Sequence, residues 1–152
     1  MQEYKLQNTH ELTIYVGSSR DAREWSPETL TWGELVGRLS EVVRTYETFE
    51  AYQSMPKTKR DSLKDVGGFV GGALKGGRRR AESVAWRSLI TLDCDYAPRL
   101  LDQSEVDFAC FLYTTHSHSP DKPRFRLIVP LKYNISPEQY PAVARWVANS
   151  LG

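Results

Sequence analysis

Residues 88–96 read Ser-Leu-Ile-Thr-Leu-Asp-Cys-Asp-Tyr, a β-branched and apolar run that finishes in two carboxylates. Such a run predicts a β-strand. Side chains alternate faces along a strand, so Asp93 and Asp95 are expected to point one way and Cys94 the other. Carboxylates held this close repel each other, and a hard divalent cation such as Mg²⁺ would offset the repulsion. The alternative is a strand-end turn with solvated acids, because turns favour Asp for local reasons.

The bulk composition is that of one ordinary domain. The chain has 152 residues, of which 40% are hydrophobic and 26% charged, so we expect a single globular domain over residues 1–152. A formal net charge of +1 carries no global signature of nucleic-acid binding, and any basic surface must be local.

Cysteine usage and hydropathy predict a cytoplasmic protein without a membrane partner. Cys94 and Cys110 both fall in predicted strands and lack the spacing of a zinc site, so we expect buried free thiols in a reducing compartment. Residues 1–4 lack the basic and apolar regions typical of a leader sequence, and no apolar stretch approaches membrane-spanning length, so we expect neither a leader nor a membrane span.

Strand patterns recur along the chain, at residues 12–16, 84–92, 106–113 and 124–131. Arg124 and Arg126 share one face of the last predicted strand, by the same period of two that pairs the aspartates.

Two helices are predicted with identifiable starts. Thr31 stands three residues before Glu34, a capping-box spacing, and an apolar face follows at Leu35, Leu39, Val42 and Tyr46. Ser136 is expected to cap a final helix with Pro137 in its first turn, and its apolar stripe is Tyr140, Val143, Ala144, Val147 and Leu151. Residues 47–55 are ambiguous, and residues 56–64 are predicted as an exposed helix or loop.

Residues 66–80 contain three Gly-Gly pairs followed by basic side chains. Glycine at this density lets main-chain N–H groups approach an anion, and nearby cations add charge. The cations are Lys75, Arg78, Arg79 and Arg80. We therefore expect a loop that contacts nucleotide phosphates or a nucleic-acid backbone, with a flexible basic surface loop as the alternative.

Acids, histidines and arginines end or begin three successive predicted strands. In chain order they are Asp93, Asp95, His116, His118, Arg124 and Arg126. A metal held by the aspartates, with the arginines and a histidine around it, would suit a triphosphate, because guanidinium groups bind phosphate oxygens bidentately. For each histidine taken singly, exposure in a turn is the alternative.

One series of motifs carries a resemblance to a known family. In order it contains Gly-Gly-Phe-Val-Gly-Gly, Gly-Gly-Arg-Arg-Arg, Leu-Asp-Cys-Asp, Tyr-Thr-Thr-His-Ser-His and Lys-Pro-Arg-Phe-Arg-Leu-Ile-Val-Pro-Leu. From about Thr31 onward the chain resembles the N-terminal primase-polymerase domain of phage and plasmid replication proteins, in the archaeo-eukaryotic primase superfamily. The resemblance implies an α/β (α+β) fold with an RRM-like mixed or antiparallel catalytic sheet flanked by helices.

The resemblance also implies a metal-dependent nucleotidyltransferase that acts on a DNA template and (d)NTPs. Asp93 and Asp95 would match the first acidic motif and hold Mg²⁺ or Mn²⁺. The second motif of the family is a small residue, any residue and then His, and it can be aligned with residues 114–116 or with residues 116–118. A third alignment places Arg126 at the position of the motif histidine. A helicase domain or a replisome component would be a further partner.

The third acidic motif of the family has no counterpart on a strand in this sequence. The late acids Asp121 and Glu138 fall in a predicted turn and a helix start. We therefore expect the chain to be the N-terminal part of a longer replication protein. The alternatives are a non-catalytic nucleic-acid or nucleotide-binding module and a metal-dependent nuclease.

Overall fold

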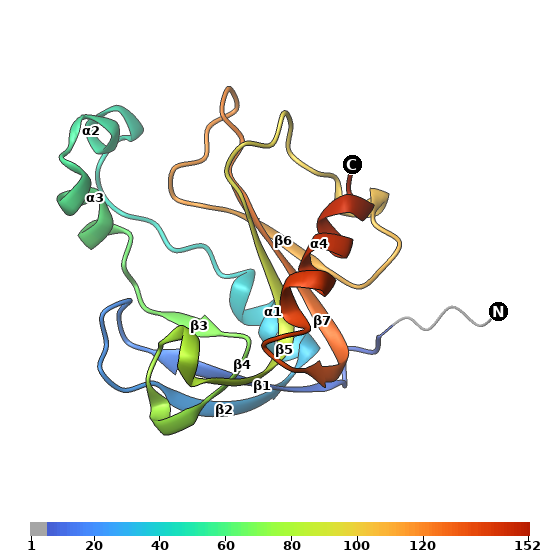
Figure 1. Cartoon of the computed structure of the whole chain (residues 1–152). Coiled ribbons are helices and arrows are strands. Elements are labelled where there is room, and N and C mark those ends of the chain that lie inside the picture. The colour runs from blue at the N-terminus through green and yellow to red at the C-terminus, as the bar shows by residue number, and fades with distance from the viewer. Residues whose placement is uncertain (1–5) are drawn as a thin grey trace.

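The computed structural model describes residues 6–152, which form two antiparallel sheets with four α-helices (Figure 1). One sheet has the strand order β2-β1-β3 and the other β4-β5-β7-β6. The strands are β1 (Glu11–Gly17), β2 (Ser26–Thr31), β3 (Gly68–Val70), β4 (Gly72–Leu74), β5 (Val84–Cys94), β6 (Phe111–Thr114) and β7 (Phe125–Ile135). The helices are α1 (Trp32–Leu39), α2 (Phe49–Ser54), α3 (Lys57–Leu63) and α4 (Tyr140–Ser150). The predicted α+β class is confirmed, with antiparallel sheets.

The long strands β5 and β7 form the centre of the four-stranded sheet. They pair antiparallel with Leu92 opposite Leu127 and Asp93 opposite Arg126. The prediction of a strand that runs up to the acidic pair is confirmed, since β5 ends at Cys94. This register brings the predicted acids and arginines to one end of the sheet.

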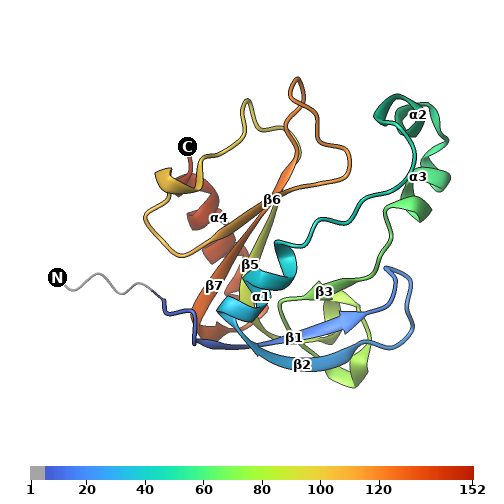
Figure 2. The same ribbon diagram turned by 180° about the vertical axis from the view of Figure 1, so that it is seen from behind.

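Alternating side chains of β5 and β7 enter two different cores. Leu89 and Ile128 pack with Leu35 of α1 and with the first sheet, whereas Ile90 packs with Val147 of α4. Helices α1 and α4 accordingly lie on opposite faces of the four-stranded sheet, as the two opposed views show (Figures 1 and 2). The predicted apolar stripe of α4 is confirmed, because all five of its residues belong to the second core.

Helix α1 begins as predicted and ends early. The Thr31 side chain accepts the Glu34 N–H at 3.1 Å, and the Glu34 carboxylate accepts the Thr31 N–H at 2.7 Å. The expected apolar face beyond Leu39 is wrong, because Val42 and Tyr46 lie on an exposed connection with 74% and 108% of their surface accessible. Among residues 6–152 no helix or strand buries these side chains, so their apolar spacing does not produce a helix.

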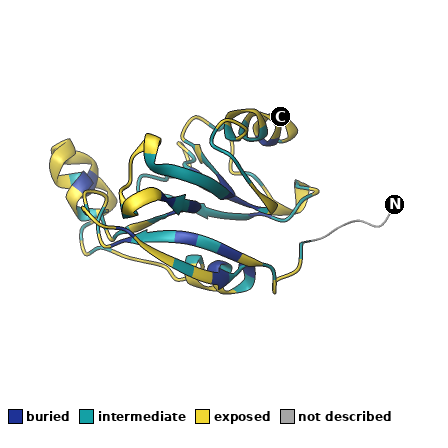
Figure 3. Cartoon of the chain, turned by 60° about the horizontal axis from the view of Figure 1, so that its bottom comes forward, coloured by how far each residue is buried: buried dark blue, intermediate teal, exposed yellow. Residues whose placement is uncertain are grey.

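Helices α2 and α3 form an arm that projects beside the two sheets (Figure 2). Most of its surface is exposed, but Tyr52 and Asp61 are buried (Figure 3). The helical alternative predicted for residues 56–64 is confirmed by α3, and the ambiguous residues 47–55 contain α2.

The glycine-rich segment is more regular than a flexible loop. Its first half contains β3 and β4, and Gly71 between them lies directly over β5. A Cβ built on Gly71 would stand 2.6 Å from the Cβ of Leu89, so only glycine permits this approach. At the next Gly-Gly pair, φ is +66° at Gly76 and +63° at Gly77. This left-handed turn leads into Arg78, Arg79 and Arg80, which we call the basic run.

Several predicted boundaries are wrong. Strand β6 covers only Phe111–Thr114, so Cys110 is buried but precedes the strand, and Cys94 is half-buried. Helix α4 starts at Tyr140 after a turn in which Ser136 Oγ accepts the Gln139 N–H at 3.3 Å. Strand β2 was missed because its sequence, Ser-Pro-Glu-Thr-Leu-Thr, is largely polar. In the described part of the chain no helix is both long and apolar enough to cross a membrane.

Candidate nucleotide-binding site

The end of β5 and the start of β7 bring an aspartate and an arginine into direct contact. Arg126 Nε donates to Asp93 Oδ1 at 2.5 Å, and Arg126 also donates to the Tyr113 hydroxyl at 3.4 Å. Burial opposes the charge of Arg126, but the Asp93 and Tyr113 contacts outweigh it and raise its pKa above the ordinary value. The guanidinium is therefore held charged at this end of the sheet.

A looser second pair lies beside the first. Arg124 Nη1 is 4.0 Å from Asp95 Oδ1, and both side chains are well exposed. Cys94 lies between the two aspartates, and its pKa is raised, first by burial and then by the charges of Asp93 and Asp95. The predicted convergence of two acids with two arginines is thus present, with each acid facing one arginine.

A cavity of about 470 Å³ opens beside the Asp93–Arg126 pair. Its walls come from the corner between β3 and β4, the basic run, β5, β7 and the start of α4. The charged residues that line it are Arg79, Arg80, Arg87, Asp93 and Arg126. We call this cavity the arginine cavity. Four arginines and one aspartate line it, and guanidinium groups are well suited to bind phosphate oxygens.

Asp95 lies outside the arginine cavity. It lines a neighbouring hollow of about 390 Å³ together with Asp93, Tyr96 and residues near the end of α4. Asp93 lines both hollows. Asp93 therefore stands between the two hollows, and Asp95 borders only the second.

The predicted basic residues divide into two groups. Arg79 and Arg80 line the arginine cavity, whereas Lys75 and Arg78 are exposed outside it. Arg79 is held from both sides, since its guanidinium lies 5.4 Å from the centre of the Trp25 ring and donates to the Arg20 carbonyl at 3.3 Å. Tertiary contacts, rather than loop flexibility, direct this arginine.

The two predicted histidines do not line the arginine cavity. His116 Nε2 lies 3.3 Å from both Glu47 Oε1 and Thr45 Oγ1, and its ring packs edge-on against Tyr52 at 4.5 Å. His118 Nδ1 accepts the Arg124 N–H at 3.1 Å. His116 thus connects the β6–β7 loop to the arm through Tyr52. His118 makes a hydrogen bond within that loop. Of the three registers for the second motif, the Arg126 register is the one whose residue lies in the cavity.

Comparison with known proteins gives one match. The family model of the VapE N-terminal domain matches residues 1–152. The chain belongs to this family. Membership is consistent with the N-terminus of a phage or plasmid replication protein and suggests a replication-associated role. No curated protein and no solved structure matches the chain.

The donor set of this VapE N-terminal domain limits how it could hold a metal. Among residues 6–152, no three His, Cys, Asp or Glu side chains gather closely enough to bind a metal by themselves. Asp93 and Asp95 supply carboxylate oxygens, the ligands that Mg²⁺ and Mn²⁺ prefer. Mg²⁺ commonly binds through one or two carboxylates together with substrate phosphates. The two aspartates fit a cation that is shared with a phosphate ligand.

Sequence reasoning missed three polar residues of the arginine cavity, Arg87, Thr91 and Tyr140. Thr91 has the same parity as Asp93 on β5, so the period of two that pairs the aspartates already marked its face. Arg87 lies beyond an irregularity of the strand between Arg87 and Leu89, so the same period could not mark it. Tyr140 reaches the cavity from α4, and the centre of its ring lies 4.6 Å from the Arg87 guanidinium. Its hydroxyl donates to the Thr91 carbonyl at 3.3 Å. The sequence marked Tyr140 only as part of the apolar stripe of this helix, because its place at the cavity depends on how α4 packs.

Proposed function

We propose that this domain binds a (deoxy)nucleoside triphosphate with Mg²⁺ or Mn²⁺ and serves as the nucleotidyl-transfer domain of a replication primase-polymerase. The observation that carries the proposal is the arginine cavity, in which four arginines and Asp93 line one hollow. Planar guanidinium groups suit phosphate oxygens, and the cavity volume of about 470 Å³ falls in the usual range for small-molecule sites. Membership in the VapE N-terminal domain family supports a role in replication.

The reaction in this proposal joins a nucleotide to a primer. The primer 3′-hydroxyl oxygen forms a bond to the α-phosphorus, and the bond from that phosphorus to the β-phosphate oxygen breaks. Pyrophosphate leaves, and the hydroxyl proton passes to solvent. A divalent cation held at Asp93 and Asp95 would neutralise phosphate charge and favour the attacking hydroxyl.

The Asp93–Arg126 contact couples the two ligands. Arg126 Nε lies 2.5 Å from Asp93 Oδ1 and neutralises this carboxylate. Phosphate oxygens compete for the same guanidinium, so nucleotide binding leaves Asp93 available to a cation. We therefore expect nucleotide and Mn²⁺ each to strengthen the binding of the other.

Binding and extension assays test the proposal with isosteric variants. Titration of a fluorescent dNTP in the presence and absence of Mn²⁺ should show metal-dependent binding in the parent domain, and Asp93→Asn combined with Asp95→Asn should abolish that dependence. Binding that is independent of Mn²⁺ and unchanged in the double variant would overturn the metal-dependent function. On a primed template, extension supports nucleotidyl transfer and shortening indicates a nuclease.

A second candidate function is a phosphate-binding module without catalysis. Each aspartate already faces an arginine, Asp93 at 2.5 Å and Asp95 at 4.0 Å, which favours neutralisation within the protein. Under this function, the Arg87→Gln variant lowers nucleotide affinity both with and without Mn²⁺. The double aspartate variant then binds nucleotide at least as tightly as the parent, because it removes negative charge beside the phosphates.

A further inference from the structure

A group of cations on the arm and the neighbouring turns forms one surface outside the arginine cavity. We define the basic strip as residues 20–21, 57–65 and 78–80. Eight of the 20 Lys and Arg residues and three of the 19 Asp and Glu residues of the chain lie in the basic strip. The remainder of the chain is therefore net negative, although the whole chain has a formal charge of +1. Positive charge is therefore concentrated in the basic strip, which the net charge of the whole chain does not reveal.

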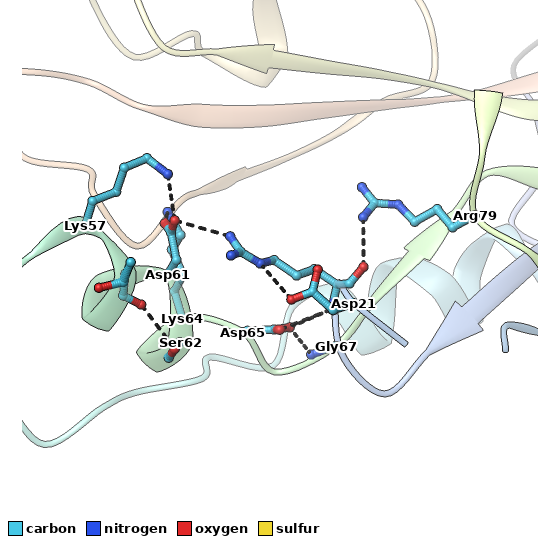
Figure 4. Close-up of polar contacts among 10 residues, drawn as sticks. Asp21, Lys57, Asp61, Ser62, Lys64, Asp65, Gly67 and Arg79 are labelled. Carbon is cyan, nitrogen blue, oxygen red and sulfur yellow. Dashed lines mark hydrogen bonds and ion pairs between the residues drawn. The ribbon is translucent and has the colours of Figure 1, made fainter. Parts of the chain in front are cut away.

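Direct contacts join the three segments of the basic strip. Arg20 Nη1 lies 3.3 Å from Asp61 Oδ2 of α3, and the Arg20 N–H donates to both Asp65 carboxylate oxygens at 3.0 and 3.1 Å. On its other side, Arg79 donates to the Arg20 carbonyl at 3.3 Å. Figure 4 shows Lys57, Asp61 and Lys64 on one side of this network and Arg79 on the other. The strip is thus continuous from α3 to the basic run.

The cations of the strip outnumber the acids that hold them in place. Asp61 is buried and receives Lys57 at 2.7 Å, Lys64 at 3.0 Å and Arg20 at 3.3 Å. One carboxylate cannot neutralise three cations, and the side chains of Lys57, Lys64 and Arg20 remain 81%, 42% and 51% exposed. Asp61 therefore spaces these cations along the surface while leaving their charge accessible to a polyanion.

The strip ends at the arginine cavity, because Arg79 and Arg80 belong to both. We infer that the basic strip binds the phosphate backbone of single-stranded DNA and leads one end of the strand to the arginine cavity. A strand rather than a duplex fits this path, since a hollow of about 470 Å³ has the size of a site for one small molecule. Contact with the strip does not depend on the proposed nucleotidyl transfer; only the placement of the strand end rests on it.

The test uses two exposed cations that have no ion-pair partner among the described residues, Lys59 and Arg78. Binding of a fluorescent oligodeoxythymidylate is measured by anisotropy over a series of NaCl concentrations. Loss of two phosphate contacts to a single strand should make the slope of log K against log[NaCl] less negative by about 1.4. We expect this change in Lys59→Gln combined with Arg78→Gln, together with weaker binding at every salt concentration.

A matched control removes the same charge elsewhere, by Lys122→Gln combined with Arg145→Gln, both exposed outside the strip. An equal change in the control would overturn the inference, because overall charge would then explain binding. Tighter binding of duplex DNA, or equal competition by polyglutamate, would overturn the choice of a single strand as the partner. The strip variant should bind dNTP with Mn²⁺ as the parent does, so failure of the strip and failure of the proposed nucleotide site give different results.

Discussion

The Arg126→Met variant probes the link between phosphate and metal binding. Arg126 and Asp93 are 37% and 58% exposed, so solvent screens their ion pair, and such pairs contribute about 0.2–1 kcal/mol. Removing Arg126 should therefore raise the affinity of the nucleotide-free domain for Mn²⁺ by about 1.4- to 5-fold. A lost hydrogen bond between a guanidinium and a phosphate should weaken triphosphate binding by about 1.5–3 kcal/mol, which is about 10- to 150-fold. The variant is thus expected to change the two affinities in opposite directions.

Isothermal titration calorimetry measures both affinities, and circular dichroism confirms that the variant is folded. Arg145→Met is the matched control, because Arg145 is exposed on α4 outside both hollows. Arg126→Lys keeps the charge but lacks the planar fork, so its nucleotide affinity should fall between the parent and the Met variant. If Arg126→Met leaves both affinities equal to those of the control, the Asp93–Arg126 pair is structural and the coupling argument is refuted.

Three further predictions concern the scaffold. Gly71→Ala should destabilise the domain by about 1–3 kcal/mol, because the added methyl group overlaps Leu89. Gly37→Ala, in open space on α1, should stabilise the domain by up to about 1 kcal/mol. Equal midpoints of urea unfolding for the two variants would contradict this prediction. The pKa of Asp61 is lowered, chiefly by Lys57 and then Lys64, so its stabilisation is complete above an unfolded pKa of about 3.9 and lost as pH falls toward the lower folded pKa. Asp61→Asn should therefore melt at a lower temperature than the parent at neutral pH. Its melting temperature should fall less than that of the parent on acidification, and parallel curves of melting temperature against pH would refute the reasoning. His116→Gln should leave nucleotide affinity unchanged while making the arm more sensitive to limited proteolysis, and a loss of affinity like that of Arg126→Met would restore His116 as the second-motif residue.

Much of the central sheet could be predicted because its signals are local. The β-branched run before Asp93 and the period of two along β5 and β7 identify strands and faces without knowledge of the fold. The capping box at Thr31 likewise marks the start of α1. The end of α1 and the whole of β2 could not be predicted, because a packing partner, rather than the local pattern, decides whether such segments are ordered as helix, strand or connection.

For the candidate site, the sequence likewise indicated the residue types but not which residues come together. The types of its central residues, Asp93 and Arg126, were visible as acids and arginines at strand ends, but only the register of β5 against β7 placed them opposite each other. His116 had an equally suggestive sequence context, and its contacts with Glu47 and Tyr52 attach it to the arm. Spacing along the chain could not distinguish the arginine from the histidine, because both lie near the ends of neighbouring strands.

By itself, the sequence determined that two carboxylates would stand at the end of a buried strand with arginines on a later strand, since strand periodicity is a property of consecutive residues. Only the tertiary structure decided that Gly71 crosses Leu89 at close range, that Arg79 and Arg87 face one cavity with Arg126, and that Arg20 connects α3 to the basic run. These contacts join residues distant along the chain, and they depend on strand register and on how helices and turns pack against the sheets.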